Sequence, residues 1–551
     1  MNMKNFTPRN NRVVADRSTR RRLAAAVLPM LVLGPSLSAA PTETLSPVAK
    51  QWWADVSFIA SDANEGRQTG SAGYMRAADY VISRMKAEGL KPAGDNGFLQ
   101  QVAFEQQVVD QDRSRAMLVN VDGSQSPLKV GDALLIRPGG EARPATVDAP
   151  LVFIGYGLGL PKQNYDDFAG LDLKGKIAVV ISGGPDNISA PIKSDARANR
   201  ESELAKLGAV GVITLTTPHQ VEIVWSRQRL IAHQAGMYLA DQKFHTVPSG
   251  FFTASADPEQ SEAFFSGSGH SFAEMSALAD ASKPVPRFEL KPRFKATVAA
   301  TRTGLTSPNL IAKLEGGDSK LKSEYVVVSA HLDHLGIGEP INGKRLYNGA
   351  MDDASGVAAV LDIAHRIANG PRPRRSVLFA IFTAEEKGLL GSRYFATNPT
   401  VPKKDIVADL NFDMPLPLWP LKMVYLPGET ESTLGADARA VGSQRGIAVV
   451  PDPNPDRNVF IRADQYSFVR EGVPALFMKF GFVKNTPEYQ IEHDWRANRY
   501  HSPSDDLDQP GVFKEEAVKL DAYTAALALH VANADARPQW LPDSIFGHKS
   551  Q

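Results

Sequence analysis

Apolar residues follow two different periods along this chain. Between positions 47 and 89 they recur at helical spacing, which predicts two helices. From about position 295, short apolar runs alternate with helical stretches. We expect strands at 309–314, 325–329, 376–382, 407–412 and 474–477, and helices at 357–368, 389–395 and 514–532. Such alternation predicts an α/β fold with a helix-covered, mixed and mostly parallel sheet.

The segment from about 115 to 290 has a different pattern. Short β-rich runs at 133–136, 150–154, 176–181 and 210–214 are separated by turns that contain Gly and Pro, with one helical stretch at 200–207. Histidines do not cluster with paired acids here. We therefore expect a non-catalytic, β-rich domain at 116–294, inserted into a catalytic domain formed by 45–115 and 295–535.

The N-terminal residues have the order of a bacterial export signal. Basic Arg17 and Arg20–Arg22 precede an apolar run at 23–33, and small residues follow at 36–40. The apolar run is too short for an ordinary membrane span, so no stable membrane insertion is expected. A leader of the general secretory type is the expected signal, and the resemblance of positions 19–23 to a twin-arginine signal is the alternative. Either signal, at 1–40, predicts a periplasmic or extracellular protein.

Composition narrows the possible partners and ligands. The 551 residues suffice for two or three domains, and 43% hydrophobic and 22% charged residues are ordinary for a globular protein. With 61 basic and 61 acidic residues, the chain gives no electrostatic reason to expect nucleic acid as a partner. Cysteine is absent, which excludes disulfides and thiolate ligands. Any zinc must be held by His, Asp and Glu.

The predicted strand at 325–329 is followed by His331 and Asp333. At spacing i and i+2 their side chains point to the same side of a strand end. A histidine that binds a metal commonly has its other ring nitrogen fixed by a carboxylate, so His331 is a candidate ligand and Asp333 its supporting group. A strand-end histidine beside an acid explains the pair equally well. His334 is expected to be a neighbour rather than a ligand.

An acid pair, Asp352 and Asp353, precedes the predicted helix at 357–368. Helix capping by Asp353 or Ser355 would explain one acid but not both. Asp352 could instead bridge two metal ions through its two oxygens, while Asp353 fixes the turn.

A second acid pair, Glu385 and Glu386, follows the predicted strand at 376–382. Thr383 and Glu386 match a capping box, which accounts for Glu386 alone. The pair is explained when one glutamate binds a metal and the other works as a general base.

Two further candidates come later in the sequence. Asp413 closes the strand predicted at 407–412, and a buried strand that ends in a lone acid is unusual without a partner. The segment Arg499-Tyr-His-Ser-Pro-Ser-Asp505 resembles an ordinary polar loop when taken alone. It supplies the second histidine, His501.

In chain order, these residues resemble the pattern of a known family: His331-x-Asp333, Asp352-Asp353, Glu385-Glu386, Asp413 and His501. The family is that of the zinc-dependent exopeptidases of metallopeptidase family twenty-eight, which includes bacterial double-zinc aminopeptidases. The resemblance covers roughly 45–115 and 295–535. It implies the phosphorylase/hydrolase-like fold of zinc peptidases.

The resemblance also implies a role for each residue. One zinc ion would be held by His331, Asp352 and Asp413, and a second by Asp352, Glu386 and His501. Glu385 would be the general base, and Tyr500 would help to stabilise the tetrahedral intermediate. Two Zn²⁺ carry four positive charges; the three ligand acids and a bridging hydroxide balance them. Glu385 would take a proton from the bridging water and pass it to the leaving amine.

Other segments resemble the protease-associated domain, namely 152–157, 165–168, 173–177 and 205–211. This resemblance identifies the inserted region as such a domain.

Some positions depart from the family pattern. Gln465 stands where relatives usually carry His, Met351 also differs, and a proline-rich stretch at 415–420 replaces small residues. The candidate ligands are unaffected, but the substrate pocket is expected to differ. Arg462 is a candidate to bind a substrate carboxylate or carbonyl, with a structural ion pair as the alternative.

The hypothesis that follows is an exported aminopeptidase with two zinc ions per chain, acting on N-terminal residues of peptides. A zinc carboxypeptidase and a glutaminyl cyclase are alternatives on the same fold. A binding protein that has lost its metals is the alternative from a different class.

Overall fold

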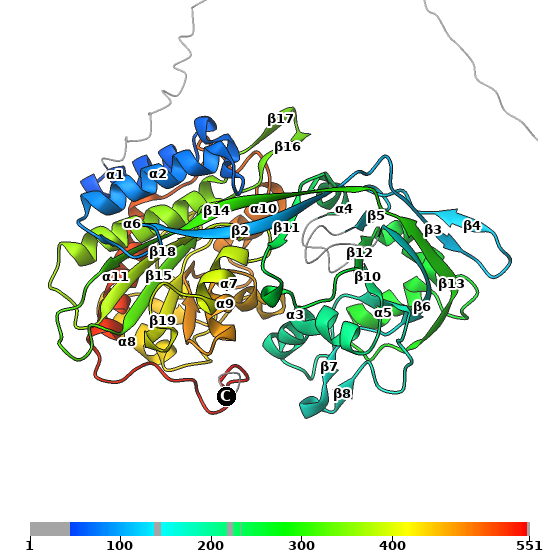
Figure 1. Ribbon diagram of the computed structural model, residues 1–551. Coiled ribbons are helices and arrows are strands. Elements are labelled where there is room, and N and C mark those ends of the chain that lie inside the picture. The colour runs from blue at the N-terminus through cyan, green and yellow to red at the C-terminus, as the bar shows by residue number, and fades with distance from the viewer. Residues whose placement is uncertain (1–44, 137–144, 218–223, 232, 548–551) are drawn as a thin grey trace, which may run out of the picture. The chain divides into compact units, whose positions relative to one another are not determined.

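A computed structural model describes residues 45–136, 145–217, 224–231 and 233–547. The chain from Leu45 onward forms one compact unit. Two large β-sheets provide its framework, each of eight strands within the described residues (Figure 1). The predicted export signal at 1–40 lies outside the described part of the chain.

The first sheet is mixed. Four neighbouring strands, β18, β15, β19 and β22, run parallel, whereas β1, β2, β11 and β14 pair antiparallel. Its order is β11-β2-β14-β18-β15-β19-β22, with β1 also paired to β14. In that order the bounds are Gly236–Leu239, Leu99–Val109, Ala300–Leu314, Ser376–Phe382, Tyr325–His331, Ile406–Asn411 and Ala475–Phe477, with β1 at Lys91–Pro92. This is the mixed, helix-covered sheet that the alternating pattern predicts.

Helices cover both faces of the parallel half (Figure 1). In β15, Val326 and Val328 belong to a core shared with α1, α2, α6 and α11. The intervening Val327 belongs to a second core, with Phe395 of α7 and Phe468 of α9. Burial on both sides explains why the sequence here is continuously apolar rather than alternating. The helix bounds are Pro47–Ile59, Ala72–Ala87, Ser355–Ala368 and Lys514–Asn533 on one face, and Leu390–Thr397 and Gln465–Arg470 on the other.

The second sheet is formed by strands between residues 115 and 297 and has its own apolar cores. Its order is β4-β3-β13-β6-β9-β10-β12-β5. The bounds in that order are Gln125–Pro127, Arg115–Val119, Phe288–Thr297, Thr146–Phe153, Ile177–Ile181, Gly211–Leu215, Phe252–Ala256 and Leu134–Ile136. Helices α3 (Ala190–Lys206) and α5 (Phe272–Asp280) belong to the same part of the chain. The assignment of 116–294 to a protease-associated domain stays a prediction.

Helix α3 is longer than the stretch predicted at 200–207. It begins at Ala190, and the side chains that it buries include Lys193 and Ser194 beside Leu204. Polar residues on the buried side hide the apolar period in the first half of the helix. The shorter prediction follows from that missing signal.

The two sheets are connected through one pair of long strands. β2 and β14 pair from Leu99↔Leu310 to Val109↔Ala300. Just beyond, the Asp110 amide donates to the Ala299 carbonyl at 2.9 Å. Between these points the chain builds the second sheet, but β11 returns to pair with β2. The segment between β2 and β14 therefore contributes to both sheets.

The described part of the chain also contains three further α-helices and three small sheets. They are helices α4 (Trp225–Gln228), α8 (Leu434–Arg445) and α10 (Pro487–Asn498), and the small sheets β16-β17 (Gly336–Ile341, Lys344–Tyr347), β21-β20-β23 (Ala448–Val450, Met423–Tyr425, Lys479–Phe480) and β7-β8 (Gly159–Leu160, Tyr165–Asp166). Among the described residues, none of the helices has the length and apolar character that crossing a bilayer requires.

Candidate metal centre

The candidate residues come from the carboxyl ends of three neighbouring parallel strands. His331 ends β15, Glu385 and Glu386 follow β18, and Asp413 follows β19. Because parallel strands end at the same edge of a sheet, these side chains meet in the region where open α/β sheets place their sites. Asp352 joins them from the turn before α6, and His501 from the loop after α10.

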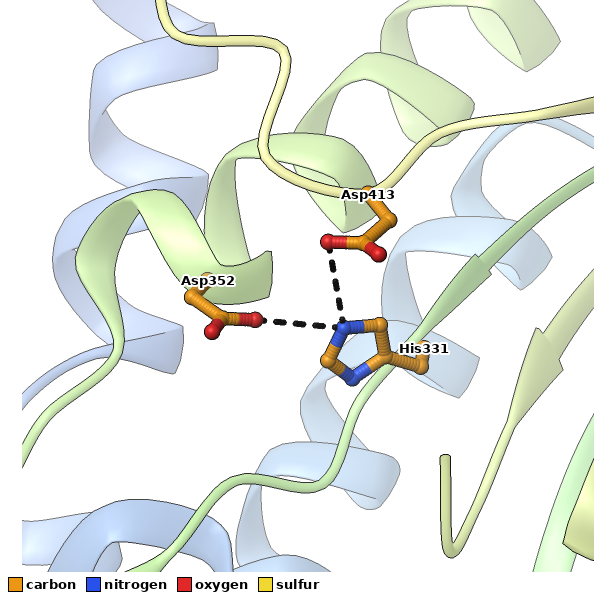
Figure 2. A group of neighbouring side chains, drawn as sticks. All are labelled: His331, Asp352 and Asp413. Carbon is orange, nitrogen blue, oxygen red and sulfur yellow. Dashed lines mark ion pairs between the residues drawn. The ribbon is translucent and has the colours of Figure 1, made fainter. Parts of the chain in front are cut away.

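The first group of side chains is His331, Asp352 and Asp413 (Figure 2). The Nε2 atom of His331 lies 3.3 Å from Oδ1 of Asp352 and 3.7 Å from Oδ1 of Asp413. All three side chains are buried. One nitrogen and two carboxylate oxygens thus point toward a common centre.

The second group shares Asp352. Its other oxygen, Oδ2, lies 3.4 Å from Nε2 of His501, and Oε2 of Glu386 lies 3.1 Å from the same nitrogen. The two oxygens of Asp352 therefore face different histidines. This geometry brings together all five side chains that the sequence singled out as candidate ligands.

His334 also reaches the second group. Its Nδ1 lies 2.6 Å from Oε1 of Glu386 and 3.9 Å from Oδ2 of Asp352. His334, Asp352 and Glu386 are close enough to hold a metal ion by themselves. Sequence reasoning treated His334 only as a neighbour. Its position three residues after His331 was the available signal.

Asp333 supports the centre through both its backbone and its side chain. Its carbonyl oxygen lies 3.0 Å from Nδ1 of His331, whereas its carboxylate is farther away, at 3.9 Å. The carboxylate accepts hydrogen bonds from the Glu385 amide and from the Thr69 hydroxyl, both at 3.0 Å. The ring of His331 is thus oriented by a carbonyl, and the side chain of Asp333 holds the backbone of Glu385 instead.

Asp353 connects three parts of the centre. Its carboxylate accepts hydrogen bonds from the amides of Gly356 and Met414, each at 3.0 Å, and of His331 at 3.4 Å. The capping contact to Gly356 explains one bond only. The others fix the strand end that carries His331 and the residue after Asp413.

Arg67, from the loop before α2, is a further supporting residue. Its guanidinium is fully buried and donates to five backbone carbonyls. These belong to the turn before Asp352, the residue after His331 and helix α1: Asn348, Gly349, Asp352, Leu332 and Ile59. Arg67 thus ties the segments of two candidate ligands to the N-terminal helices.

The electrostatics of the centre favour bound positive charge. Burial, together with the carboxylates of Asp413 and Glu386, raises the pKa of Glu385 well above its usual value. Although burial disfavours an imidazolium, Glu386 and Asp352 raise the pKa of His501 to about 10. Both pKa values are raised because several carboxylates lie close together in a buried space. A cation bound among the carboxylates would lower both pKa values.

The donor atoms fit a metal ion. Nε2 of His331, Oδ2 of Asp352 and Oδ1 of Asp413 are buried without a hydrogen-bond partner. Buried polar atoms normally have hydrogen-bond partners. Three such atoms without partners in one centre therefore indicate that they bind an ion rather than a neighbouring side chain. Imidazole nitrogen and carboxylate oxygen are the zinc ligands open to a chain without cysteine.

Tyr500 and Arg462 line a pocket beside Glu385. Burial, with Asp352 and Glu386 nearby, raises the pKa of Tyr500 well above its usual value, so its hydroxyl stays protonated. Arg462 is exposed, and its guanidinium lies close enough to oppose that shift. Gln465 lies outside this lining. Its amide donates to the Phe460 carbonyl at 2.8 Å, and it is buried.

The segment that precedes β11 also contacts the centre. Arg227 of α4 donates to the carbonyls of Tyr500 and His501. Further along, Gln234 donates to the Leu335 carbonyl at 3.3 Å and accepts from the Lys387 ammonium at 3.2 Å. Residues adjacent to Glu386 and His334 are therefore held from outside the first sheet.

Comparison with known proteins supports a peptidase relationship. Residues 309–520 match the model of peptidase family M28. Leupeptin-inactivating enzyme 1 of Streptomyces exfoliatus is 30% identical over 218 residues, which are 38% of this chain and 45% of that protein. A probable lipoprotein aminopeptidase, LpqL, of Mycobacterium tuberculosis is 29% identical over 237 residues, 38% of this chain and 43% of the relative. The matches thus span less than half of each relative.

The fold comparison extends further along the chain. The structure of an aminopeptidase from Aneurinibacillus sp. strain AM-1 superposes with a TM-score of 0.51 at 21% identity. It covers 89% of this chain and 94% of that one. At this identity the likeness concerns the fold, and it agrees with the α/β architecture described above. Residues 309–520, which match the family model, include all five candidate ligands and Glu385. This chain therefore contains a domain of peptidase family M28.

Proposed function

We propose that this protein is a zinc-dependent aminopeptidase that holds two zinc ions and removes N-terminal residues from peptides. The observation that carries the proposal is the geometry of Asp352, whose two oxygens face His331 on one side and His501 on the other. A carboxylate placed in this way can serve two ions at once.

The residues divide into two ligand sets. His331, Asp352 and Asp413 would hold one ion, and Asp352, Glu386 and His501 the other. His334 is better placed as a support, because it contacts the Glu386 oxygen that faces away from His501. Ligating carboxylates are commonly hydrogen-bonded in this manner. Zinc at these positions would supply a Lewis acid that polarises the scissile carbonyl and acidifies water.

Glu385 is the proposed general base. Its amide is fixed by Asp333, and its carboxyl group is buried among acids that raise its affinity for a proton. The carboxylate takes a proton from the attacking water and delivers it to the leaving nitrogen. Tyr500, which keeps its proton, donates a hydrogen bond to the carbonyl oxygen as negative charge develops there.

We also propose that the protein is exported and that residues 116–294 form a protease-associated domain. Export is supported by the basic, apolar and small-residue order of 1–40. The domain assignment is supported by the separate sheet and cores of that segment, together with the four sequence stretches that resemble such domains.

The test combines metal analysis with a substrate panel. We expect two zinc ions per chain, loss of hydrolysis of leucine 4-nitroanilide on chelation, and recovery when zinc is returned. C-terminally amidated peptides should be cleaved and N-acetylated peptides should not, whereas a carboxypeptidase would show the reverse. One metal ion with cyclisation of N-terminal glutamine would indicate a cyclase. A protein without metal and without hydrolysis would be a binding protein.

A further inference from the structure

A series of buried polar side chains crosses one face of the first sheet, next to the strand ends that carry the candidate ligands. Ser329 of β15 lies opposite Asn411 of β19, and Asp409 is two residues earlier on the same face of β19. Gln465, one of the positions that depart from the family pattern, contacts Asn411 from the start of α9. All four side chains are completely buried. The proposed chemistry does not use them.

The direction of the hydrogen bonds in this series is fixed at Gln465. Its amide nitrogen, Nε2, donates to the Phe460 carbonyl at 2.8 Å, and a carbonyl oxygen can only accept. Oε1 of Gln465 therefore faces Asn411 and accepts a hydrogen bond from its Nδ2 at 2.8 Å. The opposite orientation of the Gln465 amide would place two acceptor oxygens against each other. One backbone carbonyl thus orients both side-chain amides.

The orientation of Asn411 in turn decides which atoms donate at Ser329 and Asp409. With its nitrogen committed to Gln465, Asn411 presents Oδ1 to the Ser329 hydroxyl at 2.9 Å, and this oxygen can only accept. The single hydroxyl proton of Ser329 is used in that bond. Oγ of Ser329 also lies 2.8 Å from Oδ1 of Asp409. A hydrogen bond between these two oxygens requires a proton on Asp409, because a carboxylate has none to donate.

The surroundings of Asp409 also disfavour a negative charge. Its other oxygen, Oδ2, is buried and has no hydrogen-bond partner among the described residues. Its neighbours in the sheet are Val327 of β15 and Ala475 of β22, neither of which is charged. Burial, with the carboxylate of Asp464 near the start of α9, raises the pKa of Asp409 well above its usual value. This direction agrees with the proton that the hydrogen-bond geometry requires.

The series joins three segments of the candidate site. Ser329 lies two residues before His331, and Asn411 lies two residues before Asp413. Phe460 belongs to a short helical turn whose neighbouring residues line the pocket at the candidate metal centre. A shift of one segment relative to the others would break a buried hydrogen bond, which is costly where water cannot replace the partner.

We propose that Asp409 is a positioning residue that keeps its proton in the folded protein at neutral pH. Its O–H group gives the series of hydrogen bonds a single direction, which ends at the Phe460 carbonyl. The two strand ends are thereby held at the spacing that His331 and Asp413 need. The effect on zinc ligands rests on the proposed function, whereas the protonation of Asp409 does not.

Infrared spectroscopy tests the protonation directly. In the difference spectrum between the protein and its Asp409→Asn variant at neutral pH, we expect the loss of a carboxylic-acid C=O band, which isotope-labelled aspartate assigns. Loss of a carboxylate band instead would overturn the proposal. Asp405→Asn is the matched control, because Oδ1 of Asp405 lies 3.8 Å from Nη2 of Arg537 and its removal should delete a carboxylate band. Asp409→Leu, which is neutral and similar in size, gives the same comparison if the Asn variant does not fold.

The pH dependence of stability gives an independent readout. A carboxyl group whose pKa is raised on folding contributes stability at low pH, and this contribution is lost as the pH rises from the usual aspartate pKa of about 4 toward the folded value. Asn at position 409 has no such proton to lose. The free energy of unfolding of the wild type should therefore fall relative to that of Asp409→Asn as the pH rises. A difference that stays constant, or that grows in favour of the wild type, would contradict the proposal.

Gln465→Met tests whether the direction is set at the far end of the series. The Asn411 amide is then free to turn, so that Ser329 can donate to an ionised Asp409. We expect the acid band of Asp409 to titrate at lower pH in this variant than in the wild type. An unchanged titration would show that the proton does not depend on the series, and would reject the proposed direction.

Zinc affinity, measured by chelator competition, tests the positioning role. Asp409→Leu should weaken zinc binding roughly tenfold, whereas Asp409→Asn should retain most of the affinity because its amide can still donate to Ser329. Equal affinities of the wild type and the Leu variant would reject the positioning role even if the acid band is present. A protein that shows the acid band but binds no zinc would reject the proposed function and retain the protonated Asp409.

Discussion

Single side chains at the centre have separable roles, and Glu385 is the sharpest example. Glu385→Gln keeps the size of the side chain but removes its capacity to accept a proton. We expect kcat to fall by about 10²- to 10⁴-fold, with KM and the two zinc ions per chain little changed. Steady-state kinetics together with metal analysis checks this. Near-normal turnover would assign the base elsewhere, and loss of zinc would make Glu385 a ligand.

At this scale, the sequence indicated the residues at strand ends, with Asp333 and Asp353 as supports, but not the other supporting side chains. His331, Glu386 and Asp413 could be inferred because parallel strands end at one edge. The role of Thr69 could not, since its contact with Asp333 crosses loops far apart in the chain. His334 lay within the motif, yet only geometry shows it against Glu386.

At the scale of elements, the helix-covered sheet was predictable because apolar runs and helical periods survive in the sequence. The antiparallel half was not, since β11 lies far from its partner β2 in the sequence. The conformation of the loop before α2 could not be predicted from the sequence either. Gly66 has a positive φ there, and a Cβ would lie 2.4 Å from the Tyr347 carbonyl. That close approach lets the next residue, Arg67, enter the core.

Arg67→Met tests whether this loop organises the centre. Five backbone carbonyls would lose a buried, charged donor. We expect the free energy of unfolding of the metal-free protein to fall by about 3 kcal/mol or more. Zinc affinity, measured by chelator competition, should fall roughly 10- to 100-fold because the Asp352 turn is loosened.

The control for Arg67 is Arg76→Met in the same region. Arg76 is exposed and pairs with Glu65 at 2.9 Å, so its removal should change stability by less than about 1 kcal/mol. If Arg67→Met loses stability but keeps its zinc affinity, Arg67 supports the fold without positioning the ligands.

At the scale of the whole molecule, the segment that precedes β11 is coupled to the candidate metal centre through Arg227. In Arg227→Ala the loop of Tyr500 and His501 loses two hydrogen bonds. We expect kcat/KM to fall by roughly tenfold, the equivalent of one charge-assisted hydrogen bond. Arg229→Ala is the matched control, because Arg229 pairs with Asp132 instead. Equal effects of the two variants would contradict the coupling.

The pairing of β2 with β14 has a consequence for how this protein could be shortened. Since Asp110 and Ala299 are already hydrogen-bonded neighbours, a tight hairpin turn could replace everything between them. Such a truncation would also remove β11, and the outer backbone groups of β2 would lose their partner. An unprotected strand of that kind recruits other chains. A minimal catalytic unit would therefore need a new edge strand, or substitutions that discourage self-association, to remain soluble.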